Sequence, residues 1–102
     1  MIREIKDNDM TAVEQSKMAV VDFNAVWCGP CKMLGPVLAE ISEEMTDVDF
    51  FGLDVDENPV PSVNYGIHSV PTLILFKDGL EVDRMIGFTP KEDLVNWIEE
   101  NR

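Results

Sequence analysis

One almost unbroken apolar run, Met18-Ala19-Val20-Val21-Asp22-Phe23, limits the folds open to this chain more than any other feature. A strand with one face in water alternates polar and apolar side chains, and this run does not alternate. It is typical of a central strand that is covered on both faces. The fold therefore needs packed layers on both sides of a sheet, and a chain of 102 residues has room for one such domain, over residues 1–102.

Short β-type runs alternate with helical patterns along the rest of the chain, which is typical of an α/β layer fold. Strands are expected over residues 2–5, 18–23, 49–55, 72–76 and 81–86. Helices are expected over residues 8–16, with Asn8 or Asp9 as the cap, over about 28–45, in a short turn that closes near Gly66, and from Thr89 onward. The last two strands are joined by Lys77-Asp78-Gly79-Leu80, which carries an Asp-Gly hairpin signal. The expected sheet is mixed, parallel first and antiparallel at its end, with helices on both faces.

Two of the expected helices have detailed signals. The helix over residues 28–45 has apolar residues at intervals of four, with two leucines beside them: Met33, Val37, Ile41 and Met45, then Leu34 and Leu38. Thr89-Pro90-Lys91-Glu92 matches a capping box with proline at the first helical position. The helix that follows is expected to bury Leu94, Val95 and Ile98.

The charge balance excludes some kinds of partner. The chain has 20 acidic and 8 basic residues, a formal net charge of −12, and no cluster of Lys or Arg that offsets it. Phosphate backbones and anionic membranes are repelled by such a surface, so we expect neither nucleic acid nor membrane as a partner. No run approaches the roughly 20 apolar residues of a membrane span, and residues 1–9 hold no signal-peptide stretch. We therefore expect a cytoplasmic protein whose two cysteines meet reducing conditions.

The cysteines lie in Trp27-Cys28-Gly29-Pro30-Cys31-Lys32, where the central strand ends and a helix begins. Two intervening residues in a first helical turn hold the sulfurs close enough to form a disulfide. At the helix start, free backbone N–H groups and the positive end of the dipole stabilise a Cys28 thiolate, which is the nucleophilic form. Cys31, one turn further in, is expected to be more buried and to stay a thiol until it is needed.

These positions predict thiol–disulfide exchange. Cys28 attacks a substrate disulfide, and Cys31 resolves the mixed disulfide and releases a dithiol. A metal site is the alternative, but a tetrahedral zinc site needs four ligands and the chain offers only His68 beyond its two cysteines. Exchange without a metal is therefore favoured, and His68 is expected to be an exposed loop residue without a catalytic role.

The motif and four other features resemble the thioredoxin family over essentially the whole chain: Pro36, Asp56-Glu57-Asn58-Pro59, Tyr65-Gly66-Ile67 and Val70-Pro71-Thr72. The resemblance implies an α/β thioredoxin fold, with a central mixed five-stranded sheet flanked by four helices. It implies a protein disulfide reductase whose only redox group is the Cys28–Cys31 pair, without a further cofactor. The implied partners are an NADPH- and flavin-dependent thioredoxin reductase and disulfide-containing proteins, and the implied state is a monomer.

The resemblance also assigns binding roles. Pro71 matches the family's cis-proline, and the backbone before it pairs with an extended substrate segment by strand addition. From the residues alone, Val70-Pro71 is equally consistent with a trans bond at a strand start. The apolar patch around the reactive sulfur is matched by Trp27, Gly29, Pro30, Val70, Ile86, Gly87 and Phe88. Taken singly, each of these fits ordinary surface or core equally well.

Asp22 is unusual before any family is considered. An acid inside this apolar run is expected to be buried, and desolvation then raises its pKa. The alternative is an Asp at a strand end that turns toward solvent. In the thioredoxin family the matching Asp lies behind the second cysteine and relays its proton, so Asp22 is expected to be the general base for Cys31, directly or through water.

Two positions depart from the family pattern. Asn24 stands where the family usually has an aromatic residue beside the active site, and Gly52 stands where many members have a lysine that pairs with the buried acid. Asp22 therefore lacks that charge partner. A non-redox binding module or chaperone is the competing function, but the intact Cys28 and Cys31 argue against it as the sole role.

Overall fold

The computed structural model describes residues 1–102 and contains one five-stranded sheet, with strand order β1-β3-β2-β4-β5. The strands are β1 (Ile2–Glu4), β2 (Met18–Asn24), β3 (Asp49–Asp54), β4 (Thr72–Lys77) and β5 (Leu80–Ile86). The pairs β1·β3 and β2·β3 are parallel, whereas β2·β4 and β4·β5 are antiparallel. The predicted mixed sheet is confirmed.

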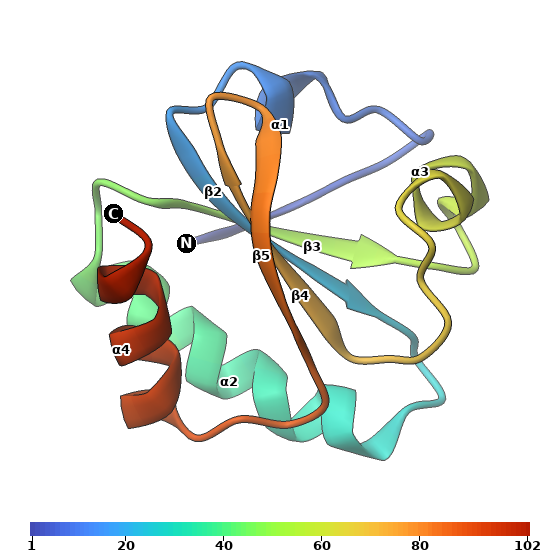
Figure 1. Ribbon diagram of the computed structural model, residues 1–102. Helices are drawn as coiled ribbons and strands as arrows, with labels where there is room; N and C mark the ends of the chain where they lie inside the picture. The colour runs from blue at the N-terminus through green and yellow to red at the C-terminus, as the bar shows by residue number, and fades with distance from the viewer.

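Four helices flank this sheet: α1 (Thr11–Glu14), α2 (Gly29–Glu44), α3 (Pro59–Asn64) and α4 (Lys91–Glu100). Figure 1 shows α2 and α4 over one face of the sheet and α1 and α3 toward the other. Successive residues of β2 pack on opposite faces of the sheet. Val20 packs in a cluster with Leu34 of α2, and Val21 packs in a second cluster with Val13 of α1. Burial on both faces explains why the sequence of β2 is apolar without alternation.

The hairpin between β4 and β5 turns through Asp78 and Gly79, with φ angles of 52° and 81°. A two-residue turn of this kind needs positive φ at both positions, which the Asp-Gly pair tolerates. Gly79 is needed for a second reason, because an added Cβ would lie 2.9 Å from the backbone oxygen of Glu14. The predicted hairpin signal is confirmed.

The first helix is shorter than predicted. It covers only Thr11–Glu14, because Asp7 and Asn8 have φ angles of 55° and 60° and cannot continue a helix. Neither predicted cap residue is at the N-cap, which is Met10. Asn8 is used elsewhere, since its side chain accepts a hydrogen bond from the Val60 backbone N–H at 3.0 Å.

The capping box predicted for the last helix is wrong. Helix α4 begins at Lys91, and its N-cap is Pro90, in extended backbone conformation and without a side-chain cap bond. Thr89 therefore lies one residue too early for its hydroxyl to cap the helix. The interior of α4 is closer to the prediction: Leu94 and Ile98 are buried, but Trp97 is the third buried residue and Val95 is only partly covered.

Helix α2 buries a stripe that is rotated from the predicted one. Leu34, Leu38 and Ile41 are fully buried and Met45 nearly so, whereas Met33 is 61% exposed. Intervals of four residues overshoot a turn of 3.6 by roughly 40° at each step, so a row of such intervals drifts around the helix. The buried positions instead combine steps of four and three, which keeps them on one side.

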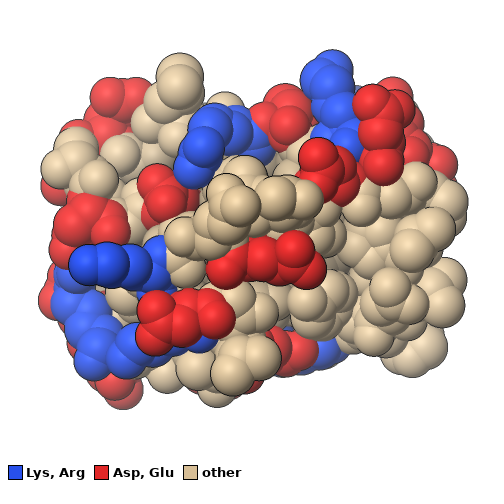
Figure 2. Space-filling view, turned by 90° about the horizontal axis from the view of Figure 1, so that it is seen from above, with Lys and Arg blue, Asp and Glu red and all other residues tan.

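The acidic residues are dispersed over the surface. Figure 2 shows Asp and Glu spread among Lys and Arg on the face that it presents, rather than gathered in one block. Some basic residues form ion pairs with two acidic residues at once, as Lys91 does with Glu40 and Glu44. None of the four helices combines the length and the apolar character that crossing a bilayer requires.

Candidate active site

Cys28 is the N-cap residue of α2, at the point where the chain leaves β2 and enters the helix. Its backbone N–H donates to the Ala25 oxygen at 3.2 Å, and its Sγ accepts the Cys31 N–H at 3.2 Å. Pro30 fits this first turn because its missing N–H would have no helical partner there. The sulfur thus accepts an N–H group of the first helical turn, and the predicted place of Cys28 at a helix start is confirmed.

Both cysteines are free thiols, and the exposed fractions of Cys28 and Cys31 are 5% and 6%. The prediction that Cys31 is the more buried of the two is therefore wrong. The reason is that both sulfurs pack in one small cluster with Ala25, against partly buried Val55 and Val70. Burial, and next the hydrogen bond with Cys28, raise the pKa of the Cys31 thiol well above its ordinary value.

The cysteine pair lies against the segment before β4. The Val70–Pro71 peptide bond is cis, which settles the alternative that the sequence left open. The Cys28 thiol donates to the Val70 carbonyl oxygen at 3.6 Å. The Pro71 carbonyl accepts the Gly87 N–H at 2.8 Å, so the end of β5 is held beside the same segment.

The predicted apolar patch is open to solvent around this point. Trp27, Gly29, Pro30, Ile86 and Phe88 are exposed, and Val70 and Gly87 are half-buried. Trp27 and Val70 line one small cavity of about 130 Å³ together with Val55, Ile67, His68 and Ser69. As predicted, His68 is exposed.

Trp27 has a partner that sequence reasoning missed. Its indole Nε1 donates to the Asp56 carboxylate at 2.9 Å, although the ring is 68% exposed. Asp56 stands in the segment Asp56-Glu57-Asn58-Pro59, so the motif was visible in the sequence but its contact was not. This hydrogen bond fixes the orientation of the exposed ring beside Cys28.

Asp22 is buried, with an exposed fraction of 6%, so it does not turn toward solvent. Its Oδ1 has no hydrogen-bond partner, and its Oδ2 accepts from the Asn24 side chain at 3.5 Å. Burial raises the pKa of Asp22 to about 7; the Asn24 hydrogen bond works against this rise and the charge of Glu4 adds to it. A carboxyl that titrates near neutrality can both take up and release a proton there.

Asp22 and Cys31 line the same cavity, which has a volume of about 250 Å³. The structure therefore brings together the predicted base and the predicted resolving thiol. Gly52 also lines this cavity and contributes no side chain to it. Lys32 lines it as well, but its ammonium group forms no ion pair with Asp22 or with Glu4, the two acidic residues at the cavity.

Glu4 is a cavity residue that sequence reasoning missed. It belongs to β1, the short edge strand, and its carboxylate occupies the place that a side chain of Gly52 would fill. No periodicity marks it, because its position beside Asp22 depends on how three strands pair. The notable signal in the sequence is Gly52, because a residue without a side chain leaves room for the Glu4 carboxylate.

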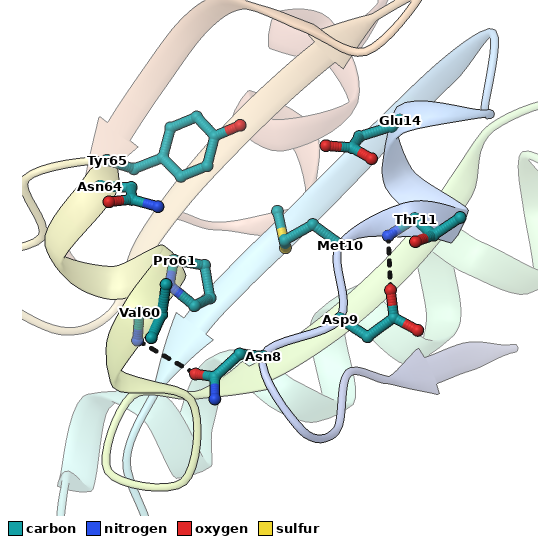
Figure 3. A pocket seen from close by; sticks show the side chains of 9 residues that line it. All are labelled: Asn8, Asp9, Met10, Thr11, Glu14, Val60, Pro61, Asn64 and Tyr65. Atoms are coloured by element: carbon teal, nitrogen blue, oxygen red, sulfur yellow. Dashed lines mark hydrogen bonds between the residues drawn. The ribbon is translucent and has the colours of Figure 1, made fainter.

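A larger cavity lies away from the cysteines. It measures about 560 Å³ and lies between residues 8–14 and α3, as Figure 3 shows. Two of its polar side chains are used within the fold: Asn8 accepts from the Val60 N–H and Asp9 from the Thr11 N–H. None of the predicted site residues lines it, and no three His, Cys, Asp or Glu side chains anywhere in the chain are grouped to hold a metal.

Known proteins show the same combination of sequence and fold. The family model described as Thioredoxin matches residues 2–100. The thioredoxin of Staphylococcus aureus, from strains that include Mu50 and MW2, is 45% identical over 101 residues, which are 98% of this chain and 97% of that protein. A solved structure of Plasmodium falciparum thioredoxin superposes with a TM-score of 0.90 at 30% identity, over 99% of this chain and 100% of that one.

Proposed function

This chain belongs to the thioredoxin family of thiol–disulfide oxidoreductases, and on that premise we propose that it reduces protein disulfides with electrons from a thioredoxin reductase. In this proposal a single thioredoxin domain over residues 1–102 carries the whole activity. The observation that carries the proposal is the place of the Cys28 sulfur, between the first turn of α2 and the Val70 carbonyl. A nucleophile in that place meets a substrate that is held by the backbone beside it.

The first step joins the substrate to Cys28. An extended substrate segment pairs with the backbone at Val70 by strand addition, and the exposed rings of Trp27 and Phe88 contact it together with Ile86. Their exposure supports a binding role, since large apolar side chains open to water mark interaction surfaces. The Cys28 thiolate attacks one sulfur of the substrate disulfide. A Cys28–substrate S–S bond forms, and the other substrate sulfur leaves with the electron pair and takes a proton.

The second step releases the substrate. Cys31 gives its proton to Asp22, and the resulting thiolate attacks the Cys28 sulfur. A Cys28–Cys31 disulfide forms, and the second substrate sulfur leaves as a thiolate that is then protonated. Two electrons have passed from the cysteine pair to the substrate. The shared cavity supports Asp22 as the base, and so does its pKa of about 7, which is closer to that of a thiol than an ordinary carboxyl reaches.

The cycle closes when a thioredoxin reductase returns two electrons to the Cys28–Cys31 disulfide. The NADPH and the flavin belong to that reductase, and this chain needs no cofactor beyond its own cysteines. We place the protein in the cytoplasm as a monomer, where it serves electron transport and cell redox homeostasis. An exchange-active cysteine pair works in surroundings that keep it reduced, and the cytoplasm provides such surroundings.

Reduction of insulin disulfides with dithiothreitol as the recycling reductant tests the proposal. The parent should accelerate insulin reduction well above the dithiothreitol background, and the Cys28→Ser variant should not. NADPH consumption with an added thioredoxin reductase tests the electron source in the same samples. Acceleration by Cys28→Ser equal to that of the parent would overturn the proposal.

A further inference from the structure

Glu4, Gly52 and Asp22 form one row across three neighbouring strands. Gly52 of β3 pairs with Glu4 of β1 on one side and with Asp22 of β2 on the other. Residues directly opposite one another in a sheet project to the same face, so the side chains of Glu4 and Asp22 emerge on one face. Neighbouring strands lie about 4.8 Å apart, so only the glycine separates two acidic residues whose Cα atoms are about 10 Å apart.

The empty place over Gly52 is taken by Glu4. A Cβ added to Gly52 would collide with the Glu4 carboxylate, chiefly with its Oε2. The Glu4 side chain therefore leans along the row, toward Asp22, rather than away from the sheet. A longer residue at position 52 would prevent this approach.

Asp22 faces the same space from the other side. Its Oδ1 is buried and has no hydrogen-bond partner, and Asp22, Glu4 and Cys31 all line the cavity of about 250 Å³. A water molecule occupies about 30 Å³ in the liquid, so the cavity that both acidic residues line has room for several waters. Glu4 itself is exposed, which puts an ionisable group at the solvent side of this space.

We propose that Glu4 is a positioning residue for the resolving step: its carboxylate charge faces Asp22 across this cavity and so sets the pH at which Asp22 can take the proton of Cys31. The inference rests on the proposed role of Asp22 as the base. The Cys31 S–H bond breaks, the proton goes to Asp22, and the sulfur electron pair attacks Cys28 as described above. A like charge that faces the same space disfavours the ionised form of Asp22.

The other charged groups around Asp22 do not replace Glu4. Helix α2 contributes Cys31, Lys32 and Gly35 to the cavity, and β3 contributes only Gly52. Lys32 is exposed and forms no ion pair with Asp22 or Glu4. The charge of Glu4 adds to the rise in the pKa of Asp22 that burial causes, and the Asn24 hydrogen bond acts against that rise.

Carboxyl NMR titration of Asp22 in the parent and two variants tests this role. In Glu4→Gln, the Asp22 midpoint should be lower than in the parent by about half a pH unit or more. The matched control is Glu92→Gln, which removes the same charge from an exposed α4 residue that does not line the cavity. It should leave Asp22 as in the parent.

The rate of the resolving step provides a second readout. An aromatic thiol is first attached to Cys28 as a mixed disulfide, and its release by Cys31 is followed across the pH range. The pH midpoint of this release should fall in Glu4→Gln by the same amount as the Asp22 midpoint, and should stay unchanged in Glu92→Gln. Glu4→Asp, which keeps a carboxylate on the same strand, should move both midpoints back toward the parent values.

The two readouts separate this inference from the proposed function. An Asp22 midpoint that is the same in Glu4→Gln and the parent overturns the role of Glu4, even if the release rate follows Asp22 in both. If the pH midpoint of the release rate does not follow the Asp22 midpoint in any variant, the role of Asp22 as the base is overturned. Glu4 is exposed, so Glu4→Gln is expected to fold, and its thermal unfolding midpoint should lie close to that of the parent.

Discussion

The Sγ atom of Cys28 lies 3.6 Å from the carbonyl oxygen of Val70, the residue that precedes cis Pro71. Cys28 is also the N-cap of α2, so it lies both at the start of a helix and beside the backbone that the proposed function assigns to substrate binding. Cys31 carries the second sulfur of the pair, but it lies neither at the helix start nor beside that backbone. It faces the cavity that holds Asp22.

Cys28 should be the only attacking thiol. Cys31→Ser should trap mixed disulfides with protein substrates through Cys28, because no resolving thiol remains. Cys28→Ser should trap none, because Cys31 lies one turn inside α2 and lacks the place at the helix start. Thiol-trapping followed by nonreducing electrophoresis and mass spectrometry measures this. Equal trapping by the two single variants contradicts the assignment.

Asp22→Asn should stabilise the fold near neutral pH and slow the resolving step. The pKa of Asp22 is raised from an ordinary value of 3.8 to about 7, so folding favours its protonated form. The stability of the parent should therefore fall as pH rises from about 4 to about 7, and stay lowered above that window. At about 1.4 kcal/mol per pH unit, the free energy of unfolding of Asp22→Asn should exceed that of the parent by up to about 4 kcal/mol at about pH 8.

Urea unfolding of the parent and Asp22→Asn at several pH values measures this difference. It should shrink toward zero as the pH falls below about 4, where Asp22 becomes protonated in both the folded and the unfolded parent. A difference that does not depend on pH would show that Asn acts through packing or hydrogen bonding instead of through ionisation.

Gly52→Lys should lower the Asp22 pKa and speed the resolving step below neutral pH. The ammonium group would enter the place that the Glu4 carboxylate now holds and would favour the ionised form of Asp22. Gly52→Met is the matched control, since it fills the same place with an unbranched chain that has no charge. Carboxyl NMR should show a larger downward change of the Asp22 midpoint in the lysine variant than in the methionine variant, in which only the displacement of Glu4 acts. An equal downward change in both variants would assign the effect to the displacement of Glu4.

Removing the Asn24 side chain should raise the Asp22 pKa further. The Asn24 amide donates to Asp22 Oδ2 at 3.5 Å and to the Asp22 carbonyl at 3.0 Å, and the first of these bonds favours the charged carboxylate. In Asn24→Ala, the resolving step should therefore need a higher pH to reach half of its maximal rate. A midpoint at or below that of the parent would count against the role of Asn24.

The fluorescence rise on reduction should be smaller than in relatives with an aromatic residue at position 24. The two tryptophans are Trp27, which is exposed and bonded to Asp56, and Trp97, which is buried in α4 and donates to Asp83. Emission spectra of the oxidised and reduced parent measure the rise, and Asn24→Trp should enlarge it. A large rise in the parent that survives Trp27→Phe would contradict this expectation.

The sequence by itself determined the features that depend on neighbouring residues. The alternation of β-type and helical runs predicted the layers, and the Asp78-Gly79 turn predicted a hairpin, because each depends on local conformational preference. The place of Cys28 at a helix start also followed from local order, since a strand, two cysteines and a helical pattern succeed one another without interruption. Asp22 was recognisable because a lone acid in an apolar run has no local explanation.

Only the tertiary structure decided what depends on packing between distant segments. Cys28 and Cys31 are almost equally buried because both pack in one cluster with Ala25, against Val55 and Val70, and nothing in the motif encodes that packing. Glu4 comes to Asp22 through two strand pairings that meet at Gly52. Periodicity reports which face of a strand is apolar, but it does not report which strands become neighbours or in what register. The register of β1 on β3 therefore decided that Glu4 lies across Gly52 from the buried Asp22.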